Sequence, residues 1–395
     1  MEALEATTAT ETARPATGTT DSPMKHMAYI QVPKDHLPGL RVSLWPCHSS
    51  RVINGVDSGV ERGHGALEPL IASVAAFSAT DQGAVGAMVD SLIAPIHAPS
   101  RGQHRRSMLN NDGLPLQVCL SSSTEKVSVR LIGDPCTGVA DTVERLRQSI
   151  RRLHDVICWT KSQGLARYYA LTVERTLPTD RRQRGNLQYG GLWLAMGVRQ
   201  GEGMALYTTL DWAEVSLRAR WRYAQEWLES ILPAGSRAAE QLGVLPLLAW
   251  PVSVGLEGSS DADAVAKVYA RLKEPVSLGN LGLDSFPLPE FAGFSERILA
   301  GRTLPDTGML ISVGFAVASG QLISTKLDIC GHCVPRSPKE WQDTILQIAR
   351  ELDVRPILVD RLLTEQPVEV AFIGLGQNVP SSYRVNLYLK AISLR

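Results

Sequence analysis

The feature of this sequence that most constrains its fold is a unit of two alternating strand patterns followed by a helical pattern, which recurs five times. In each unit a break rich in Gly, Ser or Asn separates the two runs, as in a β-hairpin. The paired runs lie at 114–133, 189–212, 249–275, 309–331 and 368–393. Central positions in the last four returning strands, at Tyr207, Lys267, Lys326 and Asn386, are 60, 59 and 60 residues apart. A constant period of this kind indicates one repeated structural unit.

Helical patterns separate the hairpins. Asp141 can cap the first helix, in which apolar residues recur at steps of three and four. In the fourth, Ser337, Pro338 and Glu340 have the spacing of a capping box. Successive hairpins require antiparallel pairing, and sheets of about ten strands tend to close. We therefore predict an α+β fold, a closed antiparallel ten-stranded β-barrel of five successive hairpins surrounded by α-helices.

Composition limits the class of protein. Forty basic and forty acidic side chains cancel, so no overall field attracts nucleic acid or an anionic membrane, and no run of about 18 apolar residues predicts a membrane span. The six irregularly spaced cysteines predict no disulfide framework and favour a cytoplasmic location. We expect residues 1–25, rich in Thr and Ala, to be a disordered tail, and residues 26–395 to form a single domain.

The alternation of the strands predicts what the barrel interior contains. Helices need an apolar surface to pack on, so the apolar strand residues face outward and the polar ones inward. The predicted inward residues include Lys126, Ser128, Arg130, Lys267, Tyr269, Arg271, Ser324, Lys326, Asp328, Arg384, Asn386 and Tyr388. Burial of several unpaired cations is prohibitively costly, so the interior must hold water or counter-charge. The alternative is that these polar faces meet bulk solvent.

Three segments carry a resemblance to a known family: "GLPLQV" at 113–118, "KVYARL" at 267–272 and "YRVNLYLK" at 383–390. Together with the order of hairpins and helices, they resemble the aromatic prenyltransferases of the ABBA type, closest to the dimethylallyltryptophan synthase branch and its bacterial relatives. The resemblance spans roughly residues 65–395.

In that family, basic residues on the inward side of successive strands bind an allylic diphosphate, and tyrosines shield the carbocation that remains when diphosphate leaves. The resemblance implies diphosphate binding by Arg130, Lys267, Lys326 and Arg384, and cation shielding by Tyr207, Tyr269 and Tyr388. Arg271 and Asn386 are further inward residues. Tyr207 has an alternative role as an outward packing residue, because "ALYTTLDW" alternates poorly.

One position departs from the family pattern. Where the fungal indole enzymes typically have a glutamate that binds the indole nitrogen, this chain has Gln117. An amide can orient an acceptor, but it is not a competent general base. The base is then another group, such as Asp328 or the released diphosphate.

No cofactor is predicted. The chain lacks an acidic cluster of the DDxxD type, which enzymes that ionise prenyl diphosphates through magnesium use to hold the ions. "CGHC" at 330–333 has no second Cys or His pair at suitable spacing for zinc. We expect a reaction without metal or Mg²⁺.

The predicted function is transfer of a dimethylallyl or longer prenyl group to an aromatic acceptor of indole type, which is a small molecule or a peptide. Two alternatives are cyclisation of a longer prenyl diphosphate in the same barrel and a non-catalytic barrel that binds a hydrophobic ligand. We expect no nucleic acid partner, no stable membrane insertion, and a monomer or homodimer.

Overall fold

A computed structural model describes most of the chain. The described residues are 29–31, 41–43, 67–94, 107–110, 112–178, 187, 190–199, 202–210, 212, 216–243, 245–273, 288–305, 308–378 and 382–392. The tail expected at residues 1–25 lies outside them.

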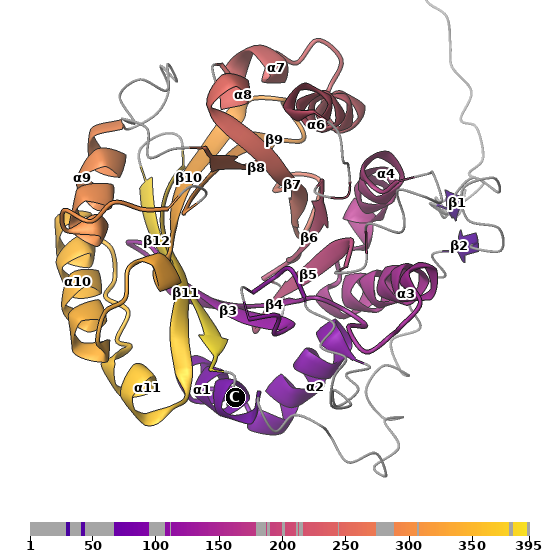
Figure 1. Ribbon diagram of the computed structural model, residues 1–395. Coiled ribbons are helices and arrows are strands. Elements are labelled where there is room, and N and C mark those ends of the chain that lie inside the picture. Colours follow the sequence, from indigo (N-terminus) through magenta and orange to yellow (C-terminus); the bar gives the residue numbers. More distant parts are fainter. Residues whose placement is uncertain are drawn as a thin grey trace, which may run out of the picture.

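Ten strands close into an antiparallel barrel, which confirms the predicted fold (Figure 1). They are β3 (Leu116–Ser122), β4 (Val127–Gly133), β5 (Leu192–Gly197), β6 (Met204–Thr209), β7 (Ala249–Gly258), β8 (Val265–Leu272), β9 (Met309–Ala316), β10 (Leu322–Cys330), β11 (Val368–Asn378) and β12 (Ser382–Ala391). Each strand pairs with its neighbour in sequence, and β12 closes the ring against β3. A separate two-stranded pair, β1 (Tyr29–Gln31) and β2 (Arg41–Ser43), lies outside the barrel.

Helices surround the barrel (Figure 1). They are α1 (Glu68–Ser78), α2 (Gln82–Ile93), α3 (Thr142–Thr160), α4 (Ala166–Thr176), α6 (Leu217–Ile231), α7 (Ala238–Gln241), α8 (Leu245–Leu248), α9 (Leu288–Leu299), α10 (Pro338–Glu351) and α11 (Asp360–Glu365). The two predicted caps are confirmed. The Asp141 side chain accepts from Glu144 N, and Ser337 and Glu340 form a reciprocal capping box at the start of α10.

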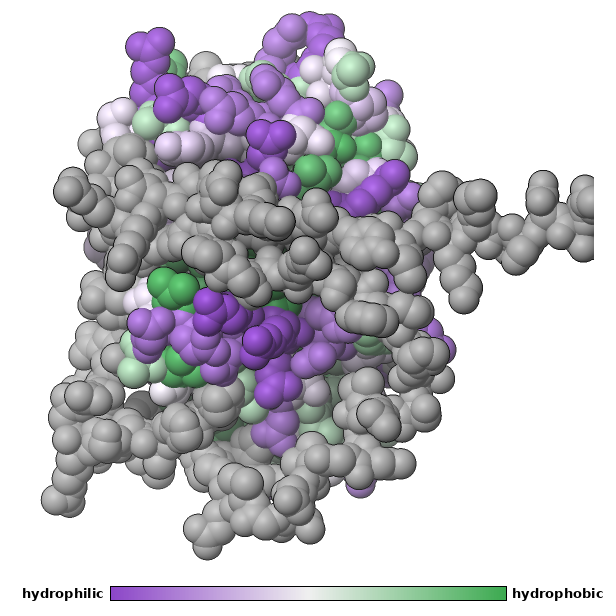
Figure 2. Space-filling model, turned by 90° about the vertical axis from the view of Figure 1, so that its right-hand side faces the viewer, coloured by the Kyte–Doolittle hydropathy of each residue, from purple (hydrophilic) through white to green (hydrophobic). Residues whose placement is uncertain are grey.

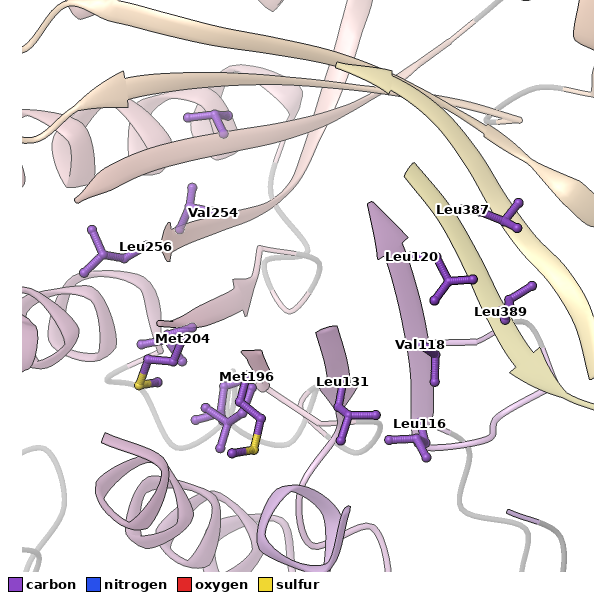
Figure 3. Close-up of a cluster of buried hydrophobic side chains, with 14 of the residues drawn as sticks. Leu116, Val118, Leu120, Leu131, Met196, Met204, Val254, Leu256, Leu387 and Leu389 are labelled. Carbon is purple, nitrogen blue, oxygen red and sulfur yellow. The ribbon is translucent and has the colours of Figure 1, made fainter. Parts of the chain in front are cut away.

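The core lies between the strands and the helices. Leu116, Val118 and Leu120 alternate along β3, and all three are buried in the main hydrophobic cluster. Leu387 and Leu389 on β12 continue this outward-facing set (Figure 3). The apolar half of each alternating pattern therefore packs under the helices, and the polar half is left for the interior.

The interior side follows the prediction with one exception. Lys126 is exposed in the turn between β3 and β4 and does not enter the barrel, because β4 begins only at Val127. Gly374 on β11 provides clearance inside the barrel, since a Cβ there would overlap the Asp328 carboxylate.

The described residues include no helix that is long and apolar enough to cross a membrane. On the side that carries α3 and α4, hydrophilic residues cover most of the described surface, with smaller hydrophobic areas between them (Figure 2).

The cysteines follow the prediction in part. Cys119, Cys136, Cys330 and Cys333 have free thiols. Cys158 is disulfide-bonded, which the irregular spacing of the cysteines did not predict.

We predict that Trp227→Ala lowers the free energy of unfolding by about 3–5 kcal/mol, because it removes a large side chain from a closed site. Trp227 is 0% exposed in α6, and its indole N–H donates to Thr172 Oγ1 at 3.1 Å on α4. Denaturant unfolding measures the loss. The matched control is Trp250→Ala, for which we expect a change within about 0.5 kcal/mol, since Trp250 is 44% exposed. Equal losses in the two variants would contradict this account of the core.

Candidate active site

Two chambers lie inside the barrel. The first, here called the cationic chamber, has a volume of about 470 Å³, including space that is open to solvent. It is lined by Cys119, Ser121, Ser128, Arg130, Ile132, Tyr207, Glu257, Lys267, Lys326, Arg384, Asn386 and Tyr388. The second, here called the aromatic chamber, encloses about 840 Å³, including space that is open to solvent. It is lined by Met108, Leu109, Gln117, Ile132, Trp193, Tyr207, Val252, Ser253, Tyr269, Arg271, Leu310, Lys326, Asp328, Phe372 and Tyr388.

The two chambers share a wall. Ile132, Tyr207, Lys326 and Tyr388 line both of them. Molecules bound in the two chambers would therefore both contact these four side chains.

Glu257 is the centre of the cationic chamber. Its Oε2 atom lies 2.8 Å from Lys267 Nζ and 3.3 Å from Arg130 Nη1. The hydroxyls of Tyr207 and Tyr269 each donate to Oε1 at 3.1 Å. One carboxylate on β7 thus holds two cations and two phenols that come from three other strands.

The charges in this chamber shift each other's protonation. Burial opposes ionisation of Glu257, but Lys267 and Arg130 outweigh it and hold the pKa of this carboxyl well below its usual value. Burial lowers the pKa of Lys267 to about 8; Glu257 opposes this shift and Arg384 adds to it. Lys267 is therefore charged at neutral pH, although its burial and the nearby Arg384 disfavour that charge.

Positive charge is in surplus. Across both chambers the lining cations are Arg130, Lys267, Arg271, Lys326 and Arg384, whereas the lining carboxylates are Glu257 and Asp328. The surplus is three charges, counted over these lining residues. Arg384 Nε is also buried without a hydrogen-bond partner among the described residues. The chambers are thus prepared for an anion with several charges.

Aromatic rings surround the shared wall. Tyr207 and Tyr269 meet edge to face with ring centroids 5.7 Å apart, and Phe372 and Tyr388 do so at 6.1 Å. Lys326 Nζ lies 5.0 Å from the centroid of the Tyr388 ring and donates to its hydroxyl at 2.7 Å. Rings at these distances can stabilise a neighbouring cation through their faces.

Gln117 has a fixed orientation in the aromatic chamber. Asn110 Nδ2 donates to the backbone carbonyls of Leu114 and Leu116, so the Asn110 Oδ1 atom is directed elsewhere and accepts from Gln117 Nε2 at 2.7 Å. The Leu109 carbonyl accepts from the same nitrogen at 2.9 Å. Both amide hydrogens of Gln117 are engaged, which leaves Oε1 to accept a hydrogen bond.

Asp328 lines the aromatic chamber and pairs with Lys326 of the shared wall. Its Oδ2 atom is 2.6 Å from Lys326 Nζ, and its side chain is 3% exposed. Lys326 therefore contacts both a carboxylate of the aromatic chamber and a phenol of the shared wall.

The structure brings the residues chosen from sequence together. Arg130, Lys267, Lys326 and Arg384 all line the cationic chamber, together with Asn386. The cationic chamber and the aromatic chamber both have Tyr207 in their walls, which excludes the alternative of an outward packing role. Gln117, Tyr269, Arg271 and Asp328 line the aromatic chamber, and Tyr388 lines both.

Sequence reasoning missed Glu257, Trp193 and Phe372. Glu257 alternates with Leu256 and Val254, which face the outer core, so the alternation of β7 up to its end at Gly258 would have placed it inward. Phe372 alternates in the same way with the buried Ile373. Among the described residues, no group of three or more His, Cys, Asp or Glu side chains could hold a metal ion.

Solved structures with the same fold include a prenyltransferase and dimethylallyltryptophan synthases. Prenyltransferase PriB, in a ternary complex with L-tryptophan and dimethylallyl thiolodiphosphate, matches with a TM-score of 0.66 and 18% identity over 82% of this chain and 95% of that chain. The 5-dimethylallyl tryptophan synthase from Streptomyces coelicolor, in complex with DMASPP and Trp, matches with a TM-score of 0.67 and 16% identity over 84% and 96%. AnaPT from Neosartorya fischeri matches with a TM-score of 0.62 and 12% identity over 83% and 92%.

The chain therefore has the barrel fold of the dimethylallyltryptophan synthases and PriB. At these identities the likeness establishes the fold, and the function must be argued from the site. No protein-family model and no curated protein sequence matches the chain.

We predict that the affinity for inorganic diphosphate, used as an anion probe, falls as pH rises above about 8. The anion favours protonated Lys267, whose pKa in the free protein is about 8, so its contribution is complete below that pH and is lost above it. Between pH 8 and 10 the Kd should rise about tenfold, which corresponds to about 1.4 kcal/mol. Isothermal titration calorimetry at each pH measures this.

The control for this prediction is Lys267→Arg, whose guanidinium stays charged throughout the range and should remove the pH dependence. Lys126→Ala changes an exposed lysine of the β3–β4 turn and should retain it. A pH profile that is the same in the wild type and in Lys267→Arg would show that another group is responsible.

Proposed function

We propose that the protein transfers a prenyl group from an allylic diphosphate to an aromatic acceptor of indole type, with release of diphosphate. The observation that carries this proposal is the shared wall, where a cationic chamber and an aromatic chamber meet at Tyr207, Lys326 and Tyr388. Transfer requires a leaving anion and a nucleophile on opposite sides of one reacting carbon, and this arrangement provides a place for each.

The cationic chamber suits the diphosphate. A prenyl diphosphate carries about three negative charges near neutral pH, because its terminal phosphate loses a second proton near pH 6, and the lining residues have a surplus of three positive charges. When the carbon–oxygen bond breaks, its electron pair leaves with the diphosphate. Fixed cations stabilise the charge that develops there, and this lowers the barrier to cleavage.

The tyrosines suit the prenyl cation. Burial raises the pKa of Tyr207, Tyr269 and Tyr388, and Glu257 adds to each shift. The phenols therefore stay neutral and are poor nucleophiles toward the cation. Their rings stabilise positive charge.

The aromatic chamber suits the acceptor. Trp193, Tyr269 and Phe372 supply apolar ring surface, and Gln117 Oε1 is fixed to accept a hydrogen bond from an acceptor N–H or O–H group. A donor on the acceptor would satisfy that oxygen, whereas an acceptor without one would leave it unpaired at a cost of about 1–3 kcal/mol. This favours an indole or a similar ring with a free donor.

We predict acceptor-dependent release of diphosphate from dimethylallyl diphosphate in the presence of EDTA, together with a gain in mass of the acceptor. The cationic chamber contains Arg130, Lys267, Lys326 and Arg384, and these residues supply the positive charge that would otherwise come from a metal ion. The screen uses dimethylallyl, geranyl and farnesyl diphosphates, each with and without tryptophan, tryptamine and tryptophan-containing dipeptides. Release and acceptor mass are measured together, by a coupled diphosphate assay and mass spectrometry.

Variants connect this activity to the site. Arg384→Ala should weaken diphosphate binding by about tenfold to a hundredfold, since a hydrogen bond to a charged group is worth about 1.5–3 kcal/mol. Lys126→Ala should bind as the wild type does. Release with a cyclic product and no acceptor would instead establish cyclisation. Absence of release with any acceptor, with diphosphate affinity that Arg384→Ala does not change, would favour a barrel that only binds a hydrophobic ligand.

A further inference from the structure

Asp328 is the one carboxylate among the described residues that line the aromatic chamber. Lys326 contacts its Oδ2 atom, but its Oδ1 atom is buried without a hydrogen-bond partner among the described residues. An unpaired buried acceptor costs about 1–3 kcal/mol, so a protein that retains one has a use for it or a ligand to satisfy it. The aromatic chamber thus contains a carboxylate of which one oxygen contacts a cation and the other has no hydrogen-bond partner among the described residues.

The strand beside Asp328 leaves room for this oxygen. Asp328 on β10 lies directly opposite Gly374 on β11, and a Cβ at position 374 would overlap Asp328 Oδ1. Any residue larger than glycine would push the carboxylate out of its position. The pair Asp328 and Gly374 therefore acts as one unit that places the carboxylate at the aromatic chamber.

Lys326 connects this carboxylate to the other chamber. Its Nζ atom contacts Asp328 Oδ2 at 2.6 Å and Tyr388 Oη at 2.7 Å, and the same side chain lines the cationic chamber. A diphosphate in the cationic chamber would attract the Lys326 ammonium group. The charge that now compensates Asp328 would then be shared with the phosphate oxygens.

We propose that Asp328 is the base that removes the proton from the prenylated ring, and that binding of the diphosphate donor activates it through Lys326. This rests on the proposed function. Loss of counter-charge makes a buried carboxylate a stronger base, so Asp328 gains basicity only when the donor is present. Gln117 cannot serve in this way, because an amide does not accept a proton at neutral pH.

Proton removal is the last step of the proposed transfer. The carbon–oxygen bond of the donor has already broken, and its electron pair is on diphosphate. A π electron pair of the acceptor forms the new carbon–carbon bond to the prenyl cation, which leaves the ring positively charged. The carbon–hydrogen bond at the attacked carbon then breaks, its electron pair restores aromaticity, and the proton passes to the Asp328 carboxylate.

Asp328→Asn tests the proposal, because the amide can still accept a hydrogen bond from Lys326 but cannot take the proton. The substrates are dimethylallyl diphosphate and the ring-deuterated form of the indole acceptor that the wild type prenylates fastest in the screen above. We expect transfer to slow about 10²-fold. A deuterium isotope effect should also appear that the wild type lacks, since proton removal becomes rate-limiting. The Kd for inorganic diphosphate should be unchanged or lower, because Lys326 is released from its anionic partner.

Two further variants separate this role from a structural one. Glu257→Gln makes the same chemical change in the other carboxylate among the described residues that line the two chambers, and it should alter diphosphate affinity without producing the isotope effect. Gly374→Ala keeps the Asp328 carboxylate but displaces it, and it should produce the isotope effect. Thermal unfolding of each variant shows whether it is folded.

The proposal is overturned if Asp328→Asn transfers as fast as the wild type, or if it slows transfer without an isotope effect and weakens diphosphate binding as well. The second result would show that Asp328 only holds Lys326 in place. Failure of the proposed function is a different result, since the wild type itself would then transfer no prenyl group.

Discussion

The interaction on which the site depends is that of Glu257 with the groups around it. Without a carboxylate at this place, Lys267 and Arg130 would be two cations confined inside a closed sheet, and the free energy of that burial would oppose folding. Glu257 also receives the Tyr207 and Tyr269 hydroxyls, so the two rings keep fixed positions. A bound anion must compete with Glu257 for the same cations. The ligand-free protein is therefore stabilised by a group that limits how tightly an anion can bind.

Glycines make this crowded interior possible. A Cβ at Gly255 would lie 2.6 Å from the Tyr207 ring, and Gly374 has the same relation to Asp328. Opposite Lys267 and Lys326, the neighbouring strands present Gly314 and Gly376. The long functional side chains thus lie over bare backbone of the next strand. The shape of the barrel interior is therefore determined by these glycines as well as by the long side chains opposite them.

The sequence predicted the closed barrel and the cluster of cations because both depend on regular alternation in the returning strands. β8 and β12 keep that alternation through Lys267 and Arg384. β7 and β11 do not, since register shifts after Pro251 and Val370 change which residues face inward, and Glu257 and Phe372 lie beyond these shifts. The hydrogen bond that fixes the Gln117 side chain could not be predicted, because its acceptor, Asn110, belongs to a loop without periodicity. Helices α1 and α2 have few polar residues to define a face, so their pattern did not reveal them.

The closure of the barrel has a consequence for how the protein is made. The seam joins β3 to β12, so Val118 pairs with Leu389 across almost the whole described chain. The first nine strands can pair as each leaves the ribosome, but the ring stays open until the last one arrives. Arg384 and Tyr388 arrive with it. A partly synthesised chain therefore lacks a sealed interior, and the complete cationic chamber forms only when translation has delivered the last strand of the ring.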